Sequence, residues 1–424
     1  MSMPTRRQFL TLAGTLPFAL SPSRRAWAKP RARVVIVGGG FGGVTCAKYL
    51  KRADPSLEVT LVTPQRQFVT CPLSNAVLVG MQELASLTYS YDHLRDRHGV
   101  RVIYSTASAL DPLKHRVTLK NGTTLTYDRL VLSPGVEFPA GALEGYDAAA
   151  SKIFPHAWEA GPQTLLLRRQ LEAMPDGGLV VLTSPEAPFR CPPGPYERAS
   201  LIAHYLKTHK PKSKVVILDA KDTFTKHELF RAAWKRLYPQ TLEWVSGSQG
   251  GRVTRVDPKS KTVHTEFEQY RAAVTNIIPP QRAAAIVRAV GLDQGTGWCP
   301  VRGSTFESTV HPGIHVIGDA AIANPMPKSA FSANNQAKVC AGAIVAMLRG
   351  EAIPQPVLMN TCYSLVAPDY GISIAAVYRV SNDKIFTIPG SEGISPLDAP
   401  DEYRAREAEY TRAWYANITA DTFA

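Results

Sequence analysis

The chain has 424 residues and a formal net charge of +13, and 45% of its residues are hydrophobic while 20% are charged. Intrinsically disordered chains combine low hydrophobicity with high net charge, so this composition excludes that class and indicates a globular protein. At about 100 to 200 residues per domain, the length predicts two or three domains.

The first 28 residues have the pattern of a bacterial twin-arginine export signal. The pair Arg6-Arg7 precedes an apolar stretch, Phe9–Leu20, and the small-residue cleavage site Ala26-Trp27-Ala28. We predict cleavage after Ala28 and a periplasmic protein. The segment contains four arginines and no acid, so its removal leaves a charge of +9, which is ordinary for a basic enzyme and indicates no nucleic-acid partner. The apolar stretch is shorter than the roughly 20 residues of a spanning helix, so we predict no membrane span.

Six cysteines follow, and an oxidising compartment would permit a disulfide among them. None lies in a C-x-x-C or C-x-x-C-H motif, so we predict neither a metal site nor a covalently attached haem. Cys46, Cys299 and Cys340 are predicted to be core residues, because free cysteine is among the most buried residue types.

A glycine-rich turn opens the mature chain. Arg33–Val37 predicts a buried parallel strand, and Val44–Arg52 predicts a helix. Between them, Gly38, Gly40 and Gly43 fit G-x-G-x-x-G, which allows a tight turn and places unpaired N–H groups of a helix terminus against a pyrophosphate. This order predicts a dinucleotide-binding domain.

Thr63 departs from this fingerprint. The next predicted strand, Glu58–Val62, should end at an acid that hydrogen-bonds the adenosine ribose, and Thr63 occupies that position. A hydroxyl group is a weak substitute for a carboxylate.

Two later segments, 127–135 and 313–320, resemble the other signatures of the two-dinucleotide-binding-domain flavoproteins of the glutathione reductase-like superfamily. The resemblance implies an α/β fold with two Rossmann-like domains, in which a second domain is inserted into the FAD-binding domain. It also implies that Gly135, Gly318 and Asp319 contact FAD, with Asp319 on the ribityl chain. A turn or cap role for Asp319 is the alternative.

The inserted domain lacks a second glycine fingerprint. After the predicted strand Gly178–Thr183, the loop 184–197 contains one glycine and five prolines, and proline has no N–H group to offer a phosphate. Lys214–Asp219 predicts the next strand. The sequence therefore predicts the strands and helices of a nucleotide-binding domain that has no nicotinamide-binding site.

Six motifs resemble the flavoprotein subunit of flavocytochrome c sulfide dehydrogenase, a relative of sulfide:quinone oxidoreductases, and the similarity runs over essentially the whole mature chain. They are Thr70–Asn75, Phe189–Ser200, Ile277–Ala283, Gly297–Val301, Asn324–Ser329 and Asn360–Ser364.

The resemblance implies roles for three cysteines and one acid. Cys71 would bond covalently to the flavin, and Cys191 and Cys362 would form a redox-active disulfide beside it. Glu197 would be an acid/base group near that disulfide. From the residue type alone, a buried apolar role would be favoured for Cys71, and the motif context reverses this. For Glu197 the alternative is a helix N-terminal acid that complements the helix dipole.

Two aromatic residues, Phe331 and Trp414, match positions near the flavin in this family, where many members have tyrosine at the first position. Either could instead be a packing residue.

The resemblance implies oxidation of hydrogen sulfide to zero-valent sulfur or polysulfide by the disulfide and FAD. Electrons would pass to a c-type haem on a separate cytochrome subunit of a heterodimer, since this chain has no C-x-x-C-H. Two alternatives stay open. One is a sulfide:quinone oxidoreductase, although the segment 401–424 is too charged for an obvious membrane-inserting helix. The other is a redox accessory flavoprotein that binds and reactivates a sulfur-oxidising complex.

The predicted organisation has five parts. They are the signal peptide 1–28, the first part of the FAD-binding domain 29–151, the inserted Rossmann-like domain 152–280, the second part of the FAD-binding domain 281–350, and a C-terminal interface domain 351–424.

Overall fold

The structure is a computed structural model that describes residues 32–424. The predicted export signal and its cleavage site therefore lie outside the described residues. Across residues 32–424, each helix is too short or too polar to cross a lipid bilayer.

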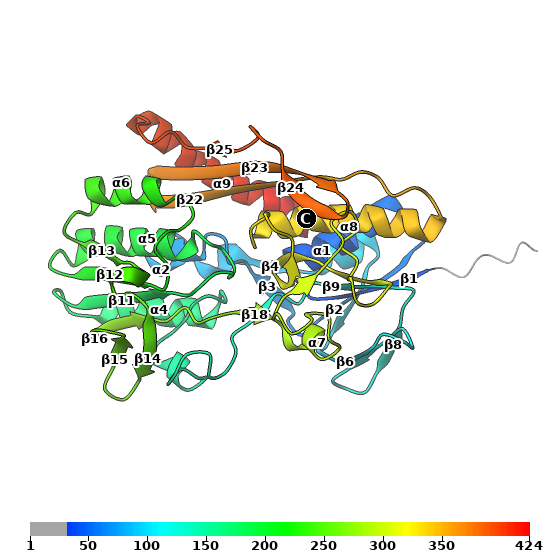
Figure 1. Cartoon of the computed structure of the whole chain (residues 1–424), viewed down its shortest axis with the longest axis horizontal. Coiled ribbons are helices and arrows are strands. Elements are labelled where there is room, and N and C mark those ends of the chain that lie inside the picture. Colours follow the sequence, from blue (N-terminus) through cyan, green and yellow to red (C-terminus); the bar gives the residue numbers. More distant parts are fainter. Residues whose placement is uncertain (1–31) are drawn as a thin grey trace, which may run out of the picture. The chain divides into compact units, whose positions relative to one another are not determined.

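The first parallel sheet carries the glycine turn (Figure 1). Its strand order is β20 (Ile314–Val316), β9 (Arg129–Leu132), β1 (Arg33–Val37), β2 (Glu58–Thr63) and β5 (Arg101–Tyr104). Side chains on the two faces of β1 enter different cores. Val34 and Ile36 pack under the helices α1 (Phe41–Ala53) and α8 (Ala330–Arg349), whereas Val35 and Val37 pack with the antiparallel strands β6–β8. Burial on both faces explains why β1 is an unbroken apolar run.

The second parallel sheet belongs to the inserted segment and repeats this plan. Its order is β13 (Leu242–Val245), β12 (Lys214–Asp219), β11 (Leu179–Ser184) and β17 (Val274–Asn276). One face packs against the helices α4 (Pro162–Ala173), α5 (Gly194–His209) and α6 (His227–Leu237), and the other against the strands β14–β16. The chain then returns to the first sheet through β20, which confirms the predicted fold class of two Rossmann-like domains.

The C-terminal segment forms an antiparallel sheet with one long helix. The sheet contains β22 (Val357–Ala367), β23 (Tyr370–Ser381), β24 (Lys384–Thr387) and β25 (Gly393–Ile394). In Figure 1, β22 extends from α5 to α8, so it contacts both earlier domains. The helix α9 (Asp401–Phe423) packs against β23.

Two charged residues of α9 are buried beneath this sheet. Arg404 donates to Glu407 Oε2 at 3.3 Å, and Glu407 Oε1 accepts hydrogen bonds from Ser373 at 2.6 Å and Ser395 at 2.5 Å. Two of the charged side chains of α9, those of Arg404 and Glu407, are therefore buried rather than exposed to solvent.

The predicted strands agree closely with the observed ones. The helix predicted from Val44 begins three residues earlier, at Phe41. The remaining elements connect these layers. They are β3 (Gln67–Val69), α2 (Ser74–Leu78), β4 (Thr88–Ser90), α3 (Asp92–His98), β6 (Ala107–Asp111), β7 (Arg116–Leu119), β8 (Thr124–Thr126), β10 (Val136–Glu137), β14 (Val253–Asp257), β15 (Thr262–Thr265), β16 (Gln269–Arg271), β18 (Arg282–Ala283), α7 (Ala285–Arg288), β19 (Cys299–Pro300) and β21 (Ala321–Ile322).

Close contact between β23 and α9 requires a glycine at position 371. A Cβ atom on Gly371 would lie 2.4 Å from the backbone nitrogen of Ala408, whereas a Cβ on Gly393 would meet no atom within 4 Å. We expect Gly371→Ala to lower the free energy of unfolding by about 1–3 kcal/mol through overpacking. Gly393→Ala should change it by less than about 0.5 kcal/mol. Scanning calorimetry of both variants checks this, and equal melting temperatures would contradict it.

Candidate active site

The glycine turn leaves a helix terminus open to an anion. Gly40 is the N-cap of α1, and neither a capping side chain nor an acid of the first turn pairs with the first N–H groups. A Cβ on Gly43 would lie 1.8 Å from the carbonyl oxygen of Gly38, so the tight turn requires glycine there. Unpaired N–H groups at the positive end of a helix dipole fit the pyrophosphate of a dinucleotide.

Thr63 packs onto this turn. Its Oγ1 lies 3.5 Å from the hydroxyl of Tyr91, which donates a 3.1 Å hydrogen bond to the carbonyl oxygen of Gly39. Thr63 is buried. The hydroxyl therefore interacts with the glycine turn through Tyr91, and the carboxylate usual for ribose binding is missing here.

The other predicted FAD-contacting residues lie at the same edge of the first sheet. Because β1, β9 and β20 are parallel neighbours, their carboxyl ends meet, and these ends lead to Gly38, Gly135 and Gly318. Asp319 follows Gly318 and is half-buried. Burial raises the pKa of its carboxyl group, and the positive charges of Arg190 and Lys328 oppose that rise.

Trp158 connects the segments of Cys71 and Cys191. The Sγ of Cys71 lies 3.7 Å from the carbonyl oxygen of Trp158, which also accepts a hydrogen bond from the guanidinium group of Arg190. The indole N–H of Trp158 donates to the carbonyl oxygen of Arg190 at 3.2 Å. Cys191 has a positive φ of 58°, and its N–H donates to the carbonyl oxygen of Lys328 at 2.8 Å.

The structure brings Cys191 and Cys362 into one electrostatic environment. Burial raises the pKa of the Cys191 thiol well above its usual range, and negative charge at Cys362 and Glu197 raises it further. Burial also raises the pKa of Cys362. Both side chains are free thiols here, so their disulfide stays a prediction. Cys46, Cys299 and Cys340 are free and fully buried, as predicted for core residues.

Glu197 contacts the segments of the three cysteines that are predicted to be functional. It lies in the first turn of α5, six residues after Cys191. Its Oε2 accepts a 2.9 Å hydrogen bond from Asn75, on the helix that follows Cys71, and its Oε1 accepts one of 2.9 Å from the N–H of Leu365, on the strand of Cys362. Burial raises the pKa of this carboxyl group, and these two donors oppose the rise.

Arg198 is buried beside Glu197 and links the same region to the second sheet. Its guanidinium group donates to Asn75 Oδ1 at 2.9 Å, Asn276 Oδ1 at 2.9 Å and the carbonyl oxygen of His156 at 2.9 Å. It also lies over the ring of Trp158, 4.8 Å from the centroid. This one cation therefore contacts three separate stretches of chain.

The two predicted aromatic residues lie in the adjoining cores. Phe331, on the first turn of α8, packs against the core under α1, and Trp414 lies 6.3 Å from the ring of Tyr363, which follows Cys362. The buried indole N–H of Trp414 has no hydrogen-bond partner among the described residues. It is thus a free donor beside the cysteine strand, whereas the geometry of Phe331 fits a packing residue.

Arg190, Arg198 and Asn75 are site residues that sequence reasoning missed. Arg190 faces Cys71, Cys191 and Asp319, so it joins the cysteines to the edge of the first sheet. Each of the three lies within a motif named above, but no periodic pattern distinguishes it. The available signal was position: Arg190 and Arg198 directly adjoin Cys191 and Glu197, and Asn75 lies in the same motif as Cys71.

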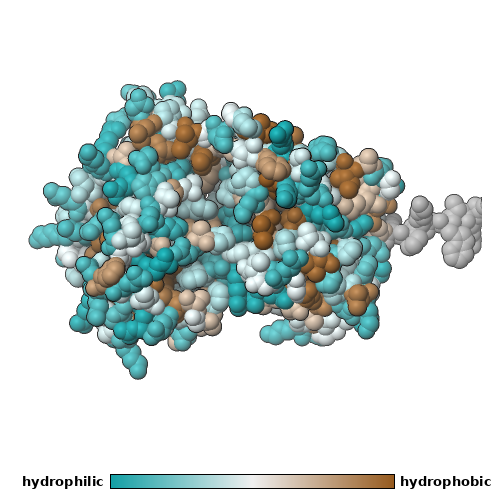
Figure 2. Space-filling view, in the orientation of Figure 1, coloured by the Kyte–Doolittle hydropathy of each residue, from teal (hydrophilic) through white to brown (hydrophobic). Residues whose placement is uncertain are grey.

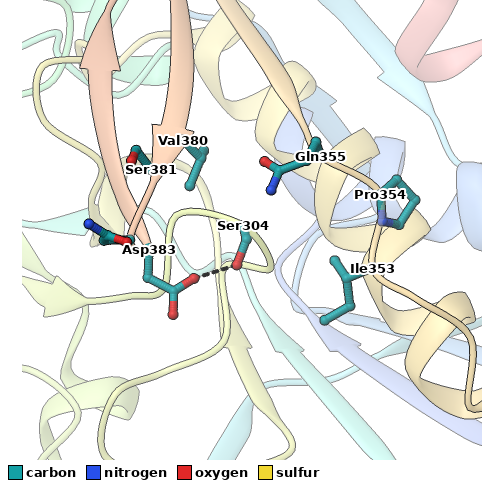
Figure 3. Close-up of a pocket in the computed structure, with 8 residues that line it drawn as sticks. Ser304, Ile353, Pro354, Gln355, Val380, Ser381 and Asp383 are labelled. Atoms are coloured by element: carbon teal, nitrogen blue, oxygen red, sulfur yellow. Dashed lines mark hydrogen bonds between the residues drawn. The ribbon is translucent and has the colours of Figure 1, made fainter.

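A surface pocket of about 230 Å³ lies apart from these residues (Figure 3). Asp383 in this pocket accepts hydrogen bonds from Ser304 at 2.5 Å and Arg302 at 3.0 Å. Its carboxylate is already paired, and none of the predicted site residues lines the pocket. Across residues 32–424, no group of three or more His, Cys, Asp or Glu residues has a metal-binding arrangement.

Family models match three segments of the chain. Residues 32–157 match "Pyridine nucleotide-disulphide oxidoreductase". Residues 164–279 match "Sulfide dehydrogenase [flavocytochrome c] flavoprotein chain, central", and residues 354–423 match "Flavocytochrome c sulphide dehydrogenase, flavin-binding".

Individual relatives agree with these models. A sulfide dehydrogenase [flavocytochrome c] flavoprotein chain from Chlorobaculum thiosulfatiphilum is 69% identical over 45 residues, which are 11% of this chain and 94% of that sequence. The mitochondrial sulfide:quinone oxidoreductase of Mus musculus is 23% identical over 72% of this chain and 68% of its own. The solved sulfide:quinone oxidoreductase from Aquifex aeolicus superposes with a TM-score of 0.73 at 17% identity, covering 93% of this chain and 92% of that chain, which establishes a common fold.

The surroundings of His156 favour its neutral imidazole over the protonated form. Its Nδ1 accepts a 3.0 Å hydrogen bond from the N–H of Trp158, and burial, with Arg198 and Arg190 nearby, lowers its pKa to about 4. The folded state disfavours protonation, so the stability from this group is complete above the unfolded pKa of about 6.5 and is lost as the pH falls towards 4.

We expect protonation of His156 to lower the free energy of unfolding by about 2 kcal/mol when the pH falls from 7.5 to 5. His156→Asn retains an acceptor and cannot be protonated, so its free energy of unfolding should fall by that much less over the same range. Urea unfolding of both proteins at the two pH values measures the difference. Equal losses would show that His156 does not titrate as inferred.

Proposed function

Because the chain belongs to the family of flavocytochrome c sulfide dehydrogenase flavoprotein chains, we propose that it oxidises sulfide with a bound FAD and a pair of cysteines and delivers electrons to a c-type cytochrome. The observation that carries this proposal is the pair of hydrogen bonds on Glu197. They join the segments of Cys71, Cys191 and Cys362 around one carboxylate.

The cysteine pair supplies the sulfur chemistry. In the oxidised enzyme, hydrosulfide attacks one sulfur of a Cys191–Cys362 disulfide; a new sulfur–sulfur bond forms while the old one breaks. One cysteine becomes a persulfide and the other a thiolate. A second hydrosulfide attacks the persulfide, so sulfur leaves as a hydrodisulfide and both cysteines remain in the reduced state.

Glu197 is placed to take the proton that hydrogen sulfide loses. Burial raises the pKa of its carboxyl group, which makes it a stronger base than an exposed glutamate. Its two hydrogen bonds fix the orientation of the carboxylate. The alternative role as a helix-terminal acid is compatible with this one, because Glu197 does lie in the first turn of α5.

The residues at the edge of the first sheet fit a flavin dinucleotide. The open N-terminus of α1 fits the pyrophosphate, Asp319 fits a hydroxyl of the ribityl chain, and Cys71 would hold the ring covalently. When bound, FAD supplies an acceptor that takes electrons in pairs and releases them singly, which suits a thiol donor and a haem acceptor.

The partner and the compartment are further parts of the proposal. The chain has no C-x-x-C-H motif, so the haem would belong to a separate cytochrome subunit in a heterodimer. The twin-arginine pattern of residues 1–28 supports export of the folded flavoprotein to the periplasm.

Anaerobic titration with sulfide tests the activity and the acceptor together. We expect stoichiometric sulfide to bleach the visible flavin band of the oxidised protein, because two electrons pass from the cysteines to FAD. Oxidised cytochrome c should then restore the band while its haem is reduced. The same experiment with a soluble quinone is the comparison, and the quinone should react more slowly.

Two outcomes would overturn parts of this proposal. Faster reoxidation by the quinone would favour a sulfide:quinone oxidoreductase. A flavin that stays oxidised in sulfide would remove the dehydrogenase and favour an accessory role in which the disulfide acts on a partner complex.

Covalent attachment through Cys71 gives a separate prediction. Because Thr63 replaces the acid that usually holds the ribose, we expect Cys71→Ala to lose flavin during gel filtration, whereas the unaltered protein keeps it even after acid precipitation. Cys340→Ala removes a buried thiol on α8 and is the matched control that should keep its flavin. Full retention of flavin by Cys71→Ala would contradict the tether.

A further inference from the structure

A buried lysine, Lys226, extends from the inserted domain to the strand of Cys362. It is the N-cap residue of α6, and its backbone has a positive φ of 64°. Its side chain is 4% exposed. The mechanism described above gives it no role, although a buried ammonium group requires partners that offset the loss of its hydration.

The hydrogen-bond partners of this ammonium group lie on β22 and β23, while the ring of Phe230 and the charge of Glu197 also lie near it. Its Nζ donates to Ser364 Oγ at 2.8 Å and approaches the carbonyl oxygens of Cys362 at 3.3 Å and Ile372 at 3.4 Å. These acceptors are two backbone carbonyls and one hydroxyl. None of them carries a negative charge that would neutralise the lysine.

Strand geometry places the thiol of Cys362 on the same side as this ammonium group. Side chains at positions i and i+2 of a strand point to one face, so Cys362 and Ser364 share a face of β22. Because Lys226 bonds the side chain of Ser364, it approaches β22 from the face that carries the Cys362 thiol. The positive charge of Lys226 accordingly lowers the pKa of Cys362, against the rise that burial causes.

The other charged groups around Cys362 are either negatively charged or paired with a group of opposite charge. Glu197 on α5 faces Cys362 with the opposite charge, and Cys191 lies beside Glu197. The helices α8 and α9 also pack against β22, and two of their cations, Lys338 and Arg404, are paired with acids of α9. Lys338 bonds Asp421, and Arg404 bonds Glu407. Lys226 is thus the cation that acts on the Cys362 sulfur from the described surroundings of this strand.

We propose that Lys226 is a positioning residue for the cysteine pair: its ammonium group fixes the Cys362 segment of β22 and favours a negatively charged sulfur at Cys362. The inference rests on the proposed use of Cys191 and Cys362 in sulfide oxidation. It adds an asymmetry to that pair, because Arg190 faces Cys191 whereas Lys226 faces Cys362.

Alkylation of the reduced holoprotein with iodoacetamide tests this inference without sulfide turnover. Only the thiolate reacts, so below the midpoint the rate at Cys362 rises about tenfold per pH unit. Peptide mass spectrometry from pH 6 to 10 follows this rate, and the displacement of the line along the pH axis gives the change in midpoint between variants. Lys226→Gln keeps a hydrogen-bond donor but removes the charge, and we expect it to raise the midpoint by about one pH unit, a roughly tenfold slower reaction below the midpoint. Lys226→Arg restores the charge and should restore the midpoint.

Lys221→Gln is the matched control. Lys221 is a partly buried lysine of the same domain, but its Nζ bonds Asp219 at 2.6 Å and Ser184 at 2.8 Å, away from β22. Its substitution should leave the Cys362 midpoint unchanged. An unchanged midpoint in Lys226→Gln, or an equal shift in Lys226→Arg, would overturn the inference and leave Lys226 a purely structural residue.

A double variant keeps the test decisive if Lys226→Gln fails to fold. Glu197→Gln combined with Lys226→Gln removes one buried charge of each sign, and its Cys362 midpoint should lie about one unit above that of Glu197→Gln alone. Equal midpoints would overturn the proposal. Because sulfide is absent from every measurement, a failure here is distinguishable from an inability to oxidise sulfide.

Discussion

Two hydrogen bonds to the carboxylate of Glu197 are the constraint on which the arrangement of this site depends. A buried carboxylate without donors would be strongly destabilising, so its oxygens must meet N–H groups. One comes from Asn75 and the other from the backbone of Leu365, at 2.9 Å each. Because these donors belong to the segments of Cys71 and Cys362, while Glu197 follows Cys191, the hydrogen bonds of this partly buried acid join three distant stretches of chain.

The inserted domain has the parallel sheet and helices of a nucleotide-binding domain, but the loop after its first strand differs from a phosphate-binding loop. In such a domain, the loop after the first strand offers flexible glycines and N–H groups to a phosphate. Here the loop between β11 and α5 is rich in proline and presents a cysteine with a positive φ instead. The backbone N–H of Cys191 is occupied by the carbonyl oxygen of Lys328. The same position in the fold therefore holds the thiol of Cys191 against the segment of Lys328, which belongs to the other nucleotide-binding domain.

Sequence reasoning predicted the frame well because the frame rests on local patterns. The strands Arg33–Val37 and Lys214–Asp219 are apolar runs with clear boundaries, and their bounds agree with the structure. Residues such as Arg198 and Lys226 could not be predicted, because their roles come from contacts between segments more than 40 positions apart. In sequence they are ordinary cations near helix ends. Their burial becomes evident only when the second sheet packs against the strands of the C-terminal segment.

The charged groups around Cys191 and Cys362 come from different domains, so the packing of the domains determines the charges that act on the two thiols. Glu197 and Asp319 contribute negative charge, and ionised thiols would add more. Four cations offset this charge: the buried Arg198 and Lys226 and the partly buried Arg190 and Lys328. Three of these cations belong to the inserted domain, whereas Asp319 and Cys362 lie outside it. Separating the domains would replace these contacts between opposite charges with hydration of each group. The charges that shift the pKa values of Cys191 and Cys362 therefore also lie at the contact between the inserted domain and the rest of the chain.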